Sequence, residues 1–528
     1  DEGAASFLRI DDAAVREIIT YIGGTHVDHD MLRRLLLLAR LGARPIRFGE
    51  GSTIVLLGSF WGLGEGVEQY LDAKRVGAGL AAYIYDVIPV SHPQYCDVNL
   101  SNAFWRALAA LLHVADFVLT ISDYTQHELK RLIGEYGGPQ LPMATVPLAH
   151  SIGQRAASSG AWPRALEKIR GDRYVAYVST VEGRKNHVYV VRAWQRMIAA
   201  GVKVPHLVFV GREGWKIDEL TALLESTGNL GGRVHIVHGL SDAELAAVYD
   251  KALFTVFTSL TEGWGLPVGE SLTHGVPCVA SRAASIPEVG GDFVDYVDPD
   301  DLNDGVRVLT RMIEDDRYRA ERRRNITAHF KARSWQDVGA DLLRALAEMR
   351  AIAPPGGEVA PVRLSEAVIF RPGDIMGRQA PLPGYFDEPL ALAMARSFYE
   401  PEPDGAWMRG GSGELTVRTT IPADGTAIIY VAVRPAPWAV DGGFSISIAG
   451  SGGRPRWMRL ADGRNLLRIE APVMDDGSCT LRFECATEPE PLPGDTRRFA
   501  VALTAIAYAS AATTGTRGEL RENFLFTA

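Results

Sequence analysis

Two glutamates flank a glycine-rich loop in the segment SLTEGWGLPVGE, which spans residues 259–270. Glu262 lies in the loop, and Glu270 follows eight positions later in a segment with a helical pattern. An apolar run precedes the segment, so we expect the loop at a strand-to-helix turn. Glycine allows close backbone approach there, and free amides at a helix start favour an anion. Since a carboxylate can accept hydrogen bonds from two sugar hydroxyls, this pattern suits a nucleotide sugar.

Two adjacent cations, Arg184 and Lys185, form the second set of candidate residues. They lie in STVEGRKNH (179–187), which also follows an apolar run. Two positive side chains beside a turn can neutralise a departing diphosphate as its charge develops. The same residues also fit a solvated turn before a helix that Asn186 caps. Asp86 likewise fits either a cleft-facing carboxylate or the acid of a turn.

The elements that must position these residues alternate between strands and helices up to about residue 353. Such alternation is the signature of doubly wound α/β domains with parallel sheets. We predict two Rossmann-like domains, residues 1–162 and 163–353. The expected strands are residues 53–58, 81–86, 117–122, 174–179, 207–211, 234–238 and 253–258, and the expected helices between them include 104–115, 188–200 and 242–251.

The pattern changes at APPGG, residues 353–357, which we interpret as a linker. Beyond it, apolar residues alternate with a period of two, and glycine-rich turns separate the runs. Residues 358–528 are therefore predicted to form an antiparallel β-sandwich. Its expected strands are residues 414–420, 427–433, 444–448, 466–470, 480–484 and 499–508.

The segment SLTEGWGLPVGESLTHGVPCVASRAASIPEVGG (259–291) resembles the glutamate-x7-glutamate region of retaining GT-B glycosyltransferases, in the large mannosyltransferase-like family four. The resemblance continues upstream and downstream in the order of that family, covering residues 50–350, and is most specific over 174–300. The matching segments are STVEGRKNH (179–187), VFVGREGW (208–215), HGLSDAELAAVY (238–249) and VDPDD (297–301), with looser matches at LLGSFW (56–61), YDVIPVSHP (85–93) and TISDYTQHEL (120–129).

The resemblance implies a GT-B fold, in which the first domain binds the acceptor and the second binds the donor. It further implies sugar transfer with retention, without a metal or other cofactor, from a nucleotide-diphosphate sugar. Arg184 and Lys185 would bind the diphosphate, Glu270 the ribose and Glu262 the transferred sugar. Asp86 would face the cleft. The remaining donor-binding positions that the resemblance implies are Gly263, Trp264, Gly265 and Leu266 for phosphate and sugar, and Gly211, Arg212 and His238 for the nucleobase.

Two positions depart from the family pattern. Many relatives carry an arginine near Thr180, a charge that only Arg184 can supply here, and many place histidine where this chain has Tyr85. The helix expected at residues 334–349 would cross back to the first domain, as in relatives.

The sequence thus predicts a hexosyltransferase, with GDP-mannose the favoured donor and a glycan, lipid-linked or protein-linked molecule as acceptor. A sugar phosphorylase on the same fold is one alternative. Another is a non-catalytic carbohydrate-binding or scaffold protein. Aromatic residues of the sandwich could stack on a sugar or pack in its core; they are Phe398, Tyr399, Trp407, Trp438 and Trp457.

Two strings look like metal sites but have simpler interpretations, so we expect no metal. HVDHD (26–30) precedes a helical pattern that Asp28 and Asp30 can cap. DPD (298–300) spells the Asp-x-Asp of metal-dependent GT-A transferases, but its proline favours a turn.

The composition of the chain limits which partners and which cellular compartment are expected. With 55 Lys+Arg against 64 Asp+Glu, the net charge of −9 argues against nucleic acid as a general partner. The four cysteines form no CxxC, residues 1–20 contain no signal-peptide core, and no apolar run reaches membrane-spanning length. We therefore expect a cytoplasmic protein. The oligomeric state stays open.

One segment could bring the chain to the cytoplasmic face of a membrane. MLRRLLLLARLGARPIR (31–47) combines a leucine run with five arginines. It could lie on an anionic membrane as a peripheral contact, or it could be a core helix with basic flanks.

Overall fold

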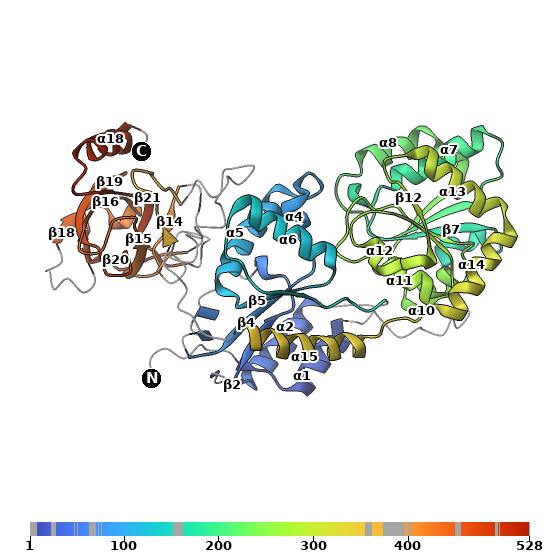
Figure 1. Cartoon of the computed structure of the whole chain (residues 1–528), viewed down its shortest axis with the longest axis horizontal. Helices are drawn as coiled ribbons and strands as arrows, with labels where there is room; N and C mark the ends of the chain where they lie inside the picture. Colours follow the sequence, from blue (N-terminus) through green and yellow to red (C-terminus); the bar gives the residue numbers. More distant parts are fainter. Residues whose placement is uncertain are drawn as a thin grey trace.

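The computed structural model contains two α/β parts and a β-sandwich, arranged in a row in Figure 1. The structure describes residues 8–22, 28–46, 48–49, 51–62, 70–71, 73–74, 76–150, 162–353, 362–372, 397–399, 402, 404–448, 456–491, 495 and 497–526. The predicted linker from Pro354 to Gly357, the predicted start of the sandwich at residue 358 and the segment just before residue 162 lie outside these ranges.

The first α/β part is built on a parallel sheet with the order β3-β4-β5-β6. Its strands are β3 (Thr53–Leu56), β4 (Gly79–Ile84), β5 (Phe117–Thr120) and β6 (Met143–Thr145). The main helices beside it are α5 (Val98–Val114), which Asp97 caps, and α6 (Asp123–Tyr136), which Ser122 caps. The short helix α4 (Ile88–Ser91) follows β4. Every residue of β4 and β5 is buried. Both faces of the sheet are therefore covered at these strands, as is typical of a parallel sheet.

The second α/β part has a six-stranded parallel sheet with the order β12-β11-β10-β7-β8-β9. Its strands are β7 (Tyr174–Val178), β8 (His206–Val210), β9 (Val234–Val237), β10 (Thr255–Phe257), β11 (Cys278–Ser281) and β12 (Val294–Val297). Its helices include α7 (His187–Ala199), α10 (Asp242–Lys251), α11 (Leu266–Thr273), α12 (Ile286–Gly290), α13 (Leu302–Glu314) and α14 (Asp316–His329). The strand order reverses between β7 and β10, and ligands of open α/β sheets bind outside the carboxyl ends of strands at such a reversal.

Helix α15 (Trp335–Ile352) returns the chain from the second part to the first. A capping box of Ser334 and Asp337 starts it. Near its end, Arg350 Nη1 donates a 2.9 Å hydrogen bond to the Gly51 carbonyl oxygen, ahead of β3. Figure 1 shows α15 running beneath the first sheet.

The C-terminal part has two facing sheets, with the orders β13-β15-β20-β17-β18 and β14-β21-β16-β19. The strands are β13 (Val362–Arg363), β14 (Ala406–Trp407), β15 (Ser412–Arg418), β16 (Thr426–Pro435), β17 (Gly443–Ile448), β18 (Arg456–Arg459), β19 (Asn465–Pro472), β20 (Ser478–Cys485) and β21 (Val501–Ser510), followed by helix α18 (Thr514–Phe526). All pairs are antiparallel except β13 with β15.

The predicted fold class, α/β followed by an antiparallel β-sandwich, is confirmed. The expected strands match observed ones with end shifts of a few residues. The strands that sequence patterning missed, among them β6, β14 and β18, are two to four residues long, too short to carry a period.

The N-terminal helices stand apart from both sheets. Helix α1 (Asp12–Ile22) and helix α2 (His29–Leu41) pack against each other as a hairpin, and Asp28 caps α2. Of the 13 residues of α2, all described, Ala39 alone is buried. The interpretation of this segment as a core helix is therefore wrong.

Candidate functional site

The cations after β7 and the glutamate after β10 meet at the strand-order reversal of the second sheet. Arg184 and Lys185 end a short 3-10 turn, η4 (Gly183–Lys185), and Glu262 lies in the loop between β10 and α11. Lys185 Nζ forms an ion pair with Glu262 Oε1. Arg184 Nη1 lies 2.9 Å from Glu262 Oε2, so both cations share one carboxylate. The structure thus brings Glu262 to two cations that lie 77 or more positions before it in the sequence.

Lys185 and Glu262 are buried, and burial strengthens the attraction between their charges. Burial raises the pKa of the Glu262 carboxyl, but Lys185 and Arg184 outweigh burial and lower that pKa to about 2. Arg184 also pairs with Glu182 at 2.8 Å. Both cations are thus paired with carboxylates in buried surroundings, where charge–charge interactions are stronger than in water.

Asp86 reaches the same cluster from the first α/β part. It follows β4 at the carboxyl end of that strand, and its carboxylate accepts a 3.0 Å hydrogen bond from the Ile88 amide. Burial raises the pKa of Asp86 above its usual value, although the Ile88 bond and the Arg184 guanidinium oppose this shift. Asp86 also interacts electrostatically with Glu262 and Lys185, so the site contains groups from both sheets.

Gly263 explains why these groups can approach each other. A Cβ on Gly263 would collide with the Tyr85 carbonyl oxygen and the Asp86 side chain. Glycine is therefore required for the loop after β10 to lie against the loop after β4. Tyr85 contributes its backbone to this contact.

The rest of the EGWGLP loop is fixed by local geometry and by the first part. Gly265 has φ +115 and directly precedes α11, whose first residue is Leu266. Trp264 is buried, and its Nε1 donates a 3.1 Å hydrogen bond to the Ala149 carbonyl oxygen. The Trp264 side chain thus joins the two α/β parts, a role that the sequence did not indicate.

Glu270 lies one turn into α11 and belongs to a different set of contacts from Glu262. Its Oε2 accepts a 2.7 Å hydrogen bond from the hydroxyl of Tyr249 on α10. Tyr249 itself is buried. Glu262 therefore lies in the loop and Glu270 in the helix that follows it, and each has its own hydrogen-bond partners.

The predicted nucleobase residues lie at the same edge of the sheet. Gly211 follows β8 and His238 follows β9, so both are at carboxyl ends of strands. A Cβ on Gly211 would collide with the Ser179 carbonyl, and the Arg212 carbonyl accepts a 2.8 Å bond from the Val181 amide. Arg212 and His238 are exposed. Gly211 and Arg212 follow the strand next to β7, whereas His238 follows β9, one strand further from the cation turn.

Several hydroxyl groups that sequence reasoning missed hold the loops in place. The Tyr177 hydroxyl donates to the Lys185 carbonyl and accepts from the Thr258 amide at 3.1 Å. Ser285 Oγ is 2.9 Å from the carbonyl oxygens of both Glu262 and Trp264. A tyrosine within an apolar strand is expected to pack in the core. The sequence therefore contains no sign that the Tyr177 hydroxyl links two loops.

The two strings that resembled metal sites are used structurally. Asp28 caps α2, accepting from the amides of Asp30 and Met31. Asp298 Oδ1 accepts a 2.9 Å bond from the Asp300 amide, which makes the DPD string a turn. His26 lies outside the described residues. Among the residues that the structure describes, no group of three or more His, Cys, Asp or Glu side chains could hold a metal.

Most aromatic side chains of the sandwich pack on each other. The rings of Trp407 and Phe499 stack at 4.4 Å, and Trp438 lies 5.7 Å from Phe499. Phe398 is buried, whereas Trp457 on the edge strand β18 is half exposed. Within the described part of the chain, no helix combines the length and apolarity needed to cross a bilayer.

Part of the sequence is similar to known glycosyltransferases. Residues 159–329 match the family described as "Glycosyl transferases group 1". The O-antigen chain mannosyltransferase B of Escherichia coli is 28% identical over 264 residues, which cover 49% of this chain and 68% of that protein. The serotype-specific mannosyltransferase WbdA of Escherichia coli is 23% identical over 261 residues. That match covers 48% of this chain and 32% of WbdA, so this chain spans about a third of that relative.

A solved structure of Anabaena HepE in complex with UDP and glucose also aligns with the chain. The sequence identity is 16% and the TM-score is 0.44, over 56% of this chain and 78% of HepE.

Proposed function

We propose that this chain is a GT-B glycosyltransferase that moves a mannosyl group from GDP-mannose to a glycan, lipid-linked or protein-linked acceptor, with retention at the anomeric carbon. Residues 159–329, which match the glycosyl transferases group 1 family, support this proposal. The observation that carries the proposal is the buried cluster of Arg184, Lys185 and Glu262, with Asp86 reaching it from the other sheet. The mannosyl donor is supported by two relatives that are named mannosyltransferases.

In the proposed reaction, the acceptor oxygen bonds to the anomeric carbon while the bond from that carbon to the diphosphate oxygen breaks. The hydroxyl proton of the acceptor passes to the departing diphosphate. Lys185 has three N–H bonds and Arg184 has five, so both can bind diphosphate oxygens while still holding Glu262. Their role is to stabilise the negative charge that develops on the leaving group.

The remaining residues orient the donor and the acceptor. Glu270 accepts from the ribose hydroxyls, and its orientation is set by the Tyr249 hydroxyl. Glu262 accepts from the hydroxyls of the transferred sugar, and Asp86 lies where the acceptor hydroxyl arrives from the first α/β part. Since Arg184 and Lys185 supply the neutralising charge, the proposed reaction uses no metal and no cofactor beyond the donor.

Two other functions would use the same fold. A sugar phosphorylase would require free phosphate, and a non-catalytic carbohydrate-binding or scaffold protein would not release nucleotide. The Arg184–Lys185–Glu262 cluster favours a transferase over the scaffold, because burying charged groups is costly and perturbed charged groups gather at functional sites.

A donor screen tests the proposal. Nucleotide release is measured for the common GDP- and UDP-sugars with EDTA present, and GDP-mannose is expected to give the highest rate. Lys185→Ala should lower turnover by about 100-fold or more, because it removes charge stabilisation of the leaving group. Lys203→Ala, an exposed lysine away from the loop, is the control and should retain full turnover. Strict dependence on a divalent metal would contradict the metal-independent mechanism, and dependence on free phosphate would indicate a phosphorylase. A higher rate with another nucleotide sugar would contradict GDP-mannose as the donor.

A further inference from the structure

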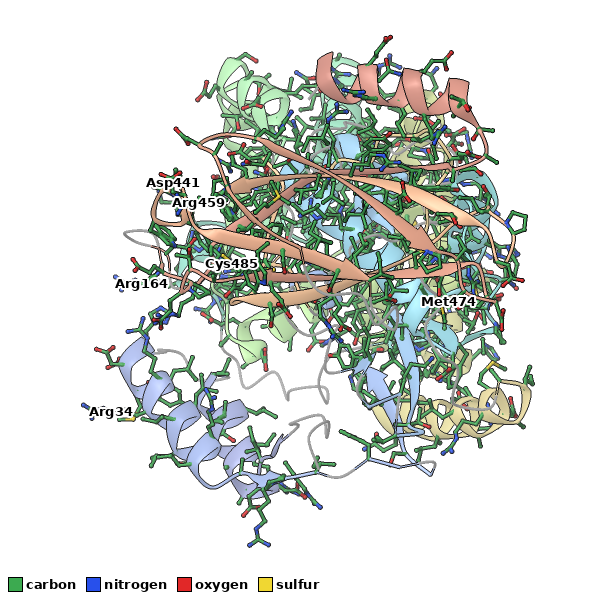
Figure 2. The ribbon with its side chains drawn as sticks, turned by 90° about the vertical axis from the view of Figure 1, so that its left-hand side faces the viewer. Arg34, Arg164, Asp441, Arg459, Met474 and Cys485 are labelled. Atoms are coloured by element: carbon green, nitrogen blue, oxygen red, sulfur yellow. The ribbon has the colours of Figure 1, made fainter. Side chains whose placement is uncertain are left out.

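Helix α2 exposes an apolar surface that includes arginines. Leu37, Leu38 and Leu41 are 57%, 65% and 74% exposed. Positions three, four and seven apart share one helix face, so Arg34 lies on the same face as all three leucines. Arg34 is exposed as well. In Figure 2 the α1–α2 hairpin stands at the edge of the molecule, with Arg34 on its outer side.

The opposite side of α2 is already occupied. Leu32, Leu35 and Ala39 are the more buried positions of the helix, and they repeat at helical spacing. Helix α1 packs against α2, and the hairpin is closed at its turn by Tyr21, whose hydroxyl accepts a 2.9 Å bond from the Asp28 amide. The exposed leucines are therefore not the face that holds the hairpin together.

The charge around this surface is mainly positive, although Asp30 in the first turn of α2 pairs with Arg33 at 3.6 Å. From Met31 to Ile46 the chain contains four arginines and no acidic residue. Arg33, Arg40 and Arg44 are exposed, next to the leucine face. In a protein with a net charge of −9, this concentration of positive charge is local. It is complementary to an anionic surface.

We propose that the leucine face of α2 docks the protein on an anionic lipid bilayer, with α2 lying in the plane of the interface. A helix of this kind buries its apolar side chains among acyl chains and places its basic residues at the phosphates. Arg34 favours this occupant over a second copy of the chain. At a bilayer its aliphatic stem lies among the leucines while its guanidinium reaches a phosphate, whereas a protein partner would have to offer it a buried carboxylate.

Vesicle sedimentation of the purified full chain tests this inference without measuring sugar transfer. The chain should sediment with phosphatidylcholine vesicles that contain phosphatidylglycerol, and much less with phosphatidylcholine alone. The double variant Leu38→Gln/Leu41→Gln should bind the anionic vesicles about tenfold or more weakly, because two inserted apolar side chains are lost. Arg34→Gln/Arg40→Gln should weaken binding about fivefold per charge and reduce its salt dependence.

Controls separate docking from folding and from self-association. Leu343→Gln changes a leucine of α15 that is 70% exposed, and it should leave vesicle binding unchanged. Because the substituted α2 residues are exposed, their variants should keep the wild-type melting temperature. The proposal is overturned if the wild type does not sediment with anionic vesicles or if the leucine variant binds as well as the wild type. It is equally overturned if that variant turns a dimer into a monomer by light scattering while vesicle binding stays the same.

Discussion

Tyr177 ties together the two loops that carry Lys185 and Glu262. Its hydroxyl sits between the Lys185 carbonyl, in the turn after β7, and the Thr258 amide, at the end of β10. Its ring stacks on His187 at 4.2 Å. Phenylalanine would keep the ring contacts but leave a buried carbonyl and a buried amide without this partner. Tyr177 is thus a positioning residue whose effect can be separated from simple packing.

We predict that Tyr177→Phe lowers the free energy of unfolding by about 1–3 kcal/mol, because buried backbone groups lose a hydrogen bond. Turnover should fall about tenfold as the two loops shift relative to each other. Tyr174→Phe is the matched control, since Tyr174 is buried on the same strand and its hydroxyl donates to the Val248 carbonyl, away from the cluster. Denaturant unfolding and steady-state rates check this, and equal rate losses in both variants would contradict the positioning role.

At the scale of elements, a carboxylate of one α/β part caps a helix of the other. The Glu288 carboxylate, on α12, accepts 2.8 Å hydrogen bonds from the amides of Asp123 and Tyr124 at the start of α6. The positive end of a helix dipole and two free amides make this a favourable position for a negative charge. The contact lies between the two sheets, so it favours the arrangement in which Asp86 meets the Glu262 loop.

We predict that Glu288→Ala loosens this arrangement. The variant loses a carboxylate that interacts favourably with the start of α6, so the two α/β parts should be held together less firmly. Turnover should fall about fivefold. The radius of gyration measured by small-angle X-ray scattering should rise. Glu244→Ala is the control, because Glu244 caps only its own helix through Ser241. An unchanged radius of gyration in Glu288→Ala would mean that the contact does not govern how the two parts sit together.

At the scale of the whole molecule, the sandwich has a core of its own. The described residues of its main apolar cluster run from Leu364 to Tyr508, and the clusters that support the site end at Ala353. The cations and carboxylates of the site all lie before residue 353. Stability of the site should therefore be nearly independent of the sandwich.

We predict that a chain ending at Ala353 still folds and binds the donor nucleotide with a Kd within about twofold of the full chain, as expected for distant, independent regions. Calorimetric titration checks the binding. Rates with short and long acceptors then identify the role of the sandwich: a loss confined to long acceptors indicates glycan binding there, and equal losses indicate a structural role. Aggregation of the shortened chain would show that the sandwich covers an apolar face of the α/β parts.

The sequence alone could predict both α/β parts and the sandwich, and it could select the residues of the candidate site. Period, strand length and turn residues are local properties, so β7, β10 and α10 could be placed from patterning. Glu262, Arg184 and Lys185 could be chosen because their types and their neighbouring glycines match an anion-binding chemistry. The resemblance to GT-B glycosyltransferases then supplied the order of domains.

Contacts between distant segments were decided only by the tertiary structure. The sharing of Glu262 by two cations depends on β7 and β10 being neighbours, a pairing set by sheet order and not by any local pattern. The use of Trp264 and Glu288 between the two parts, and of Tyr177 between two loops, arises in the same way. The exposure of α2 is likewise a tertiary property, because a leucine-rich helix has the same sequence pattern whether a core or a surface receives its apolar face.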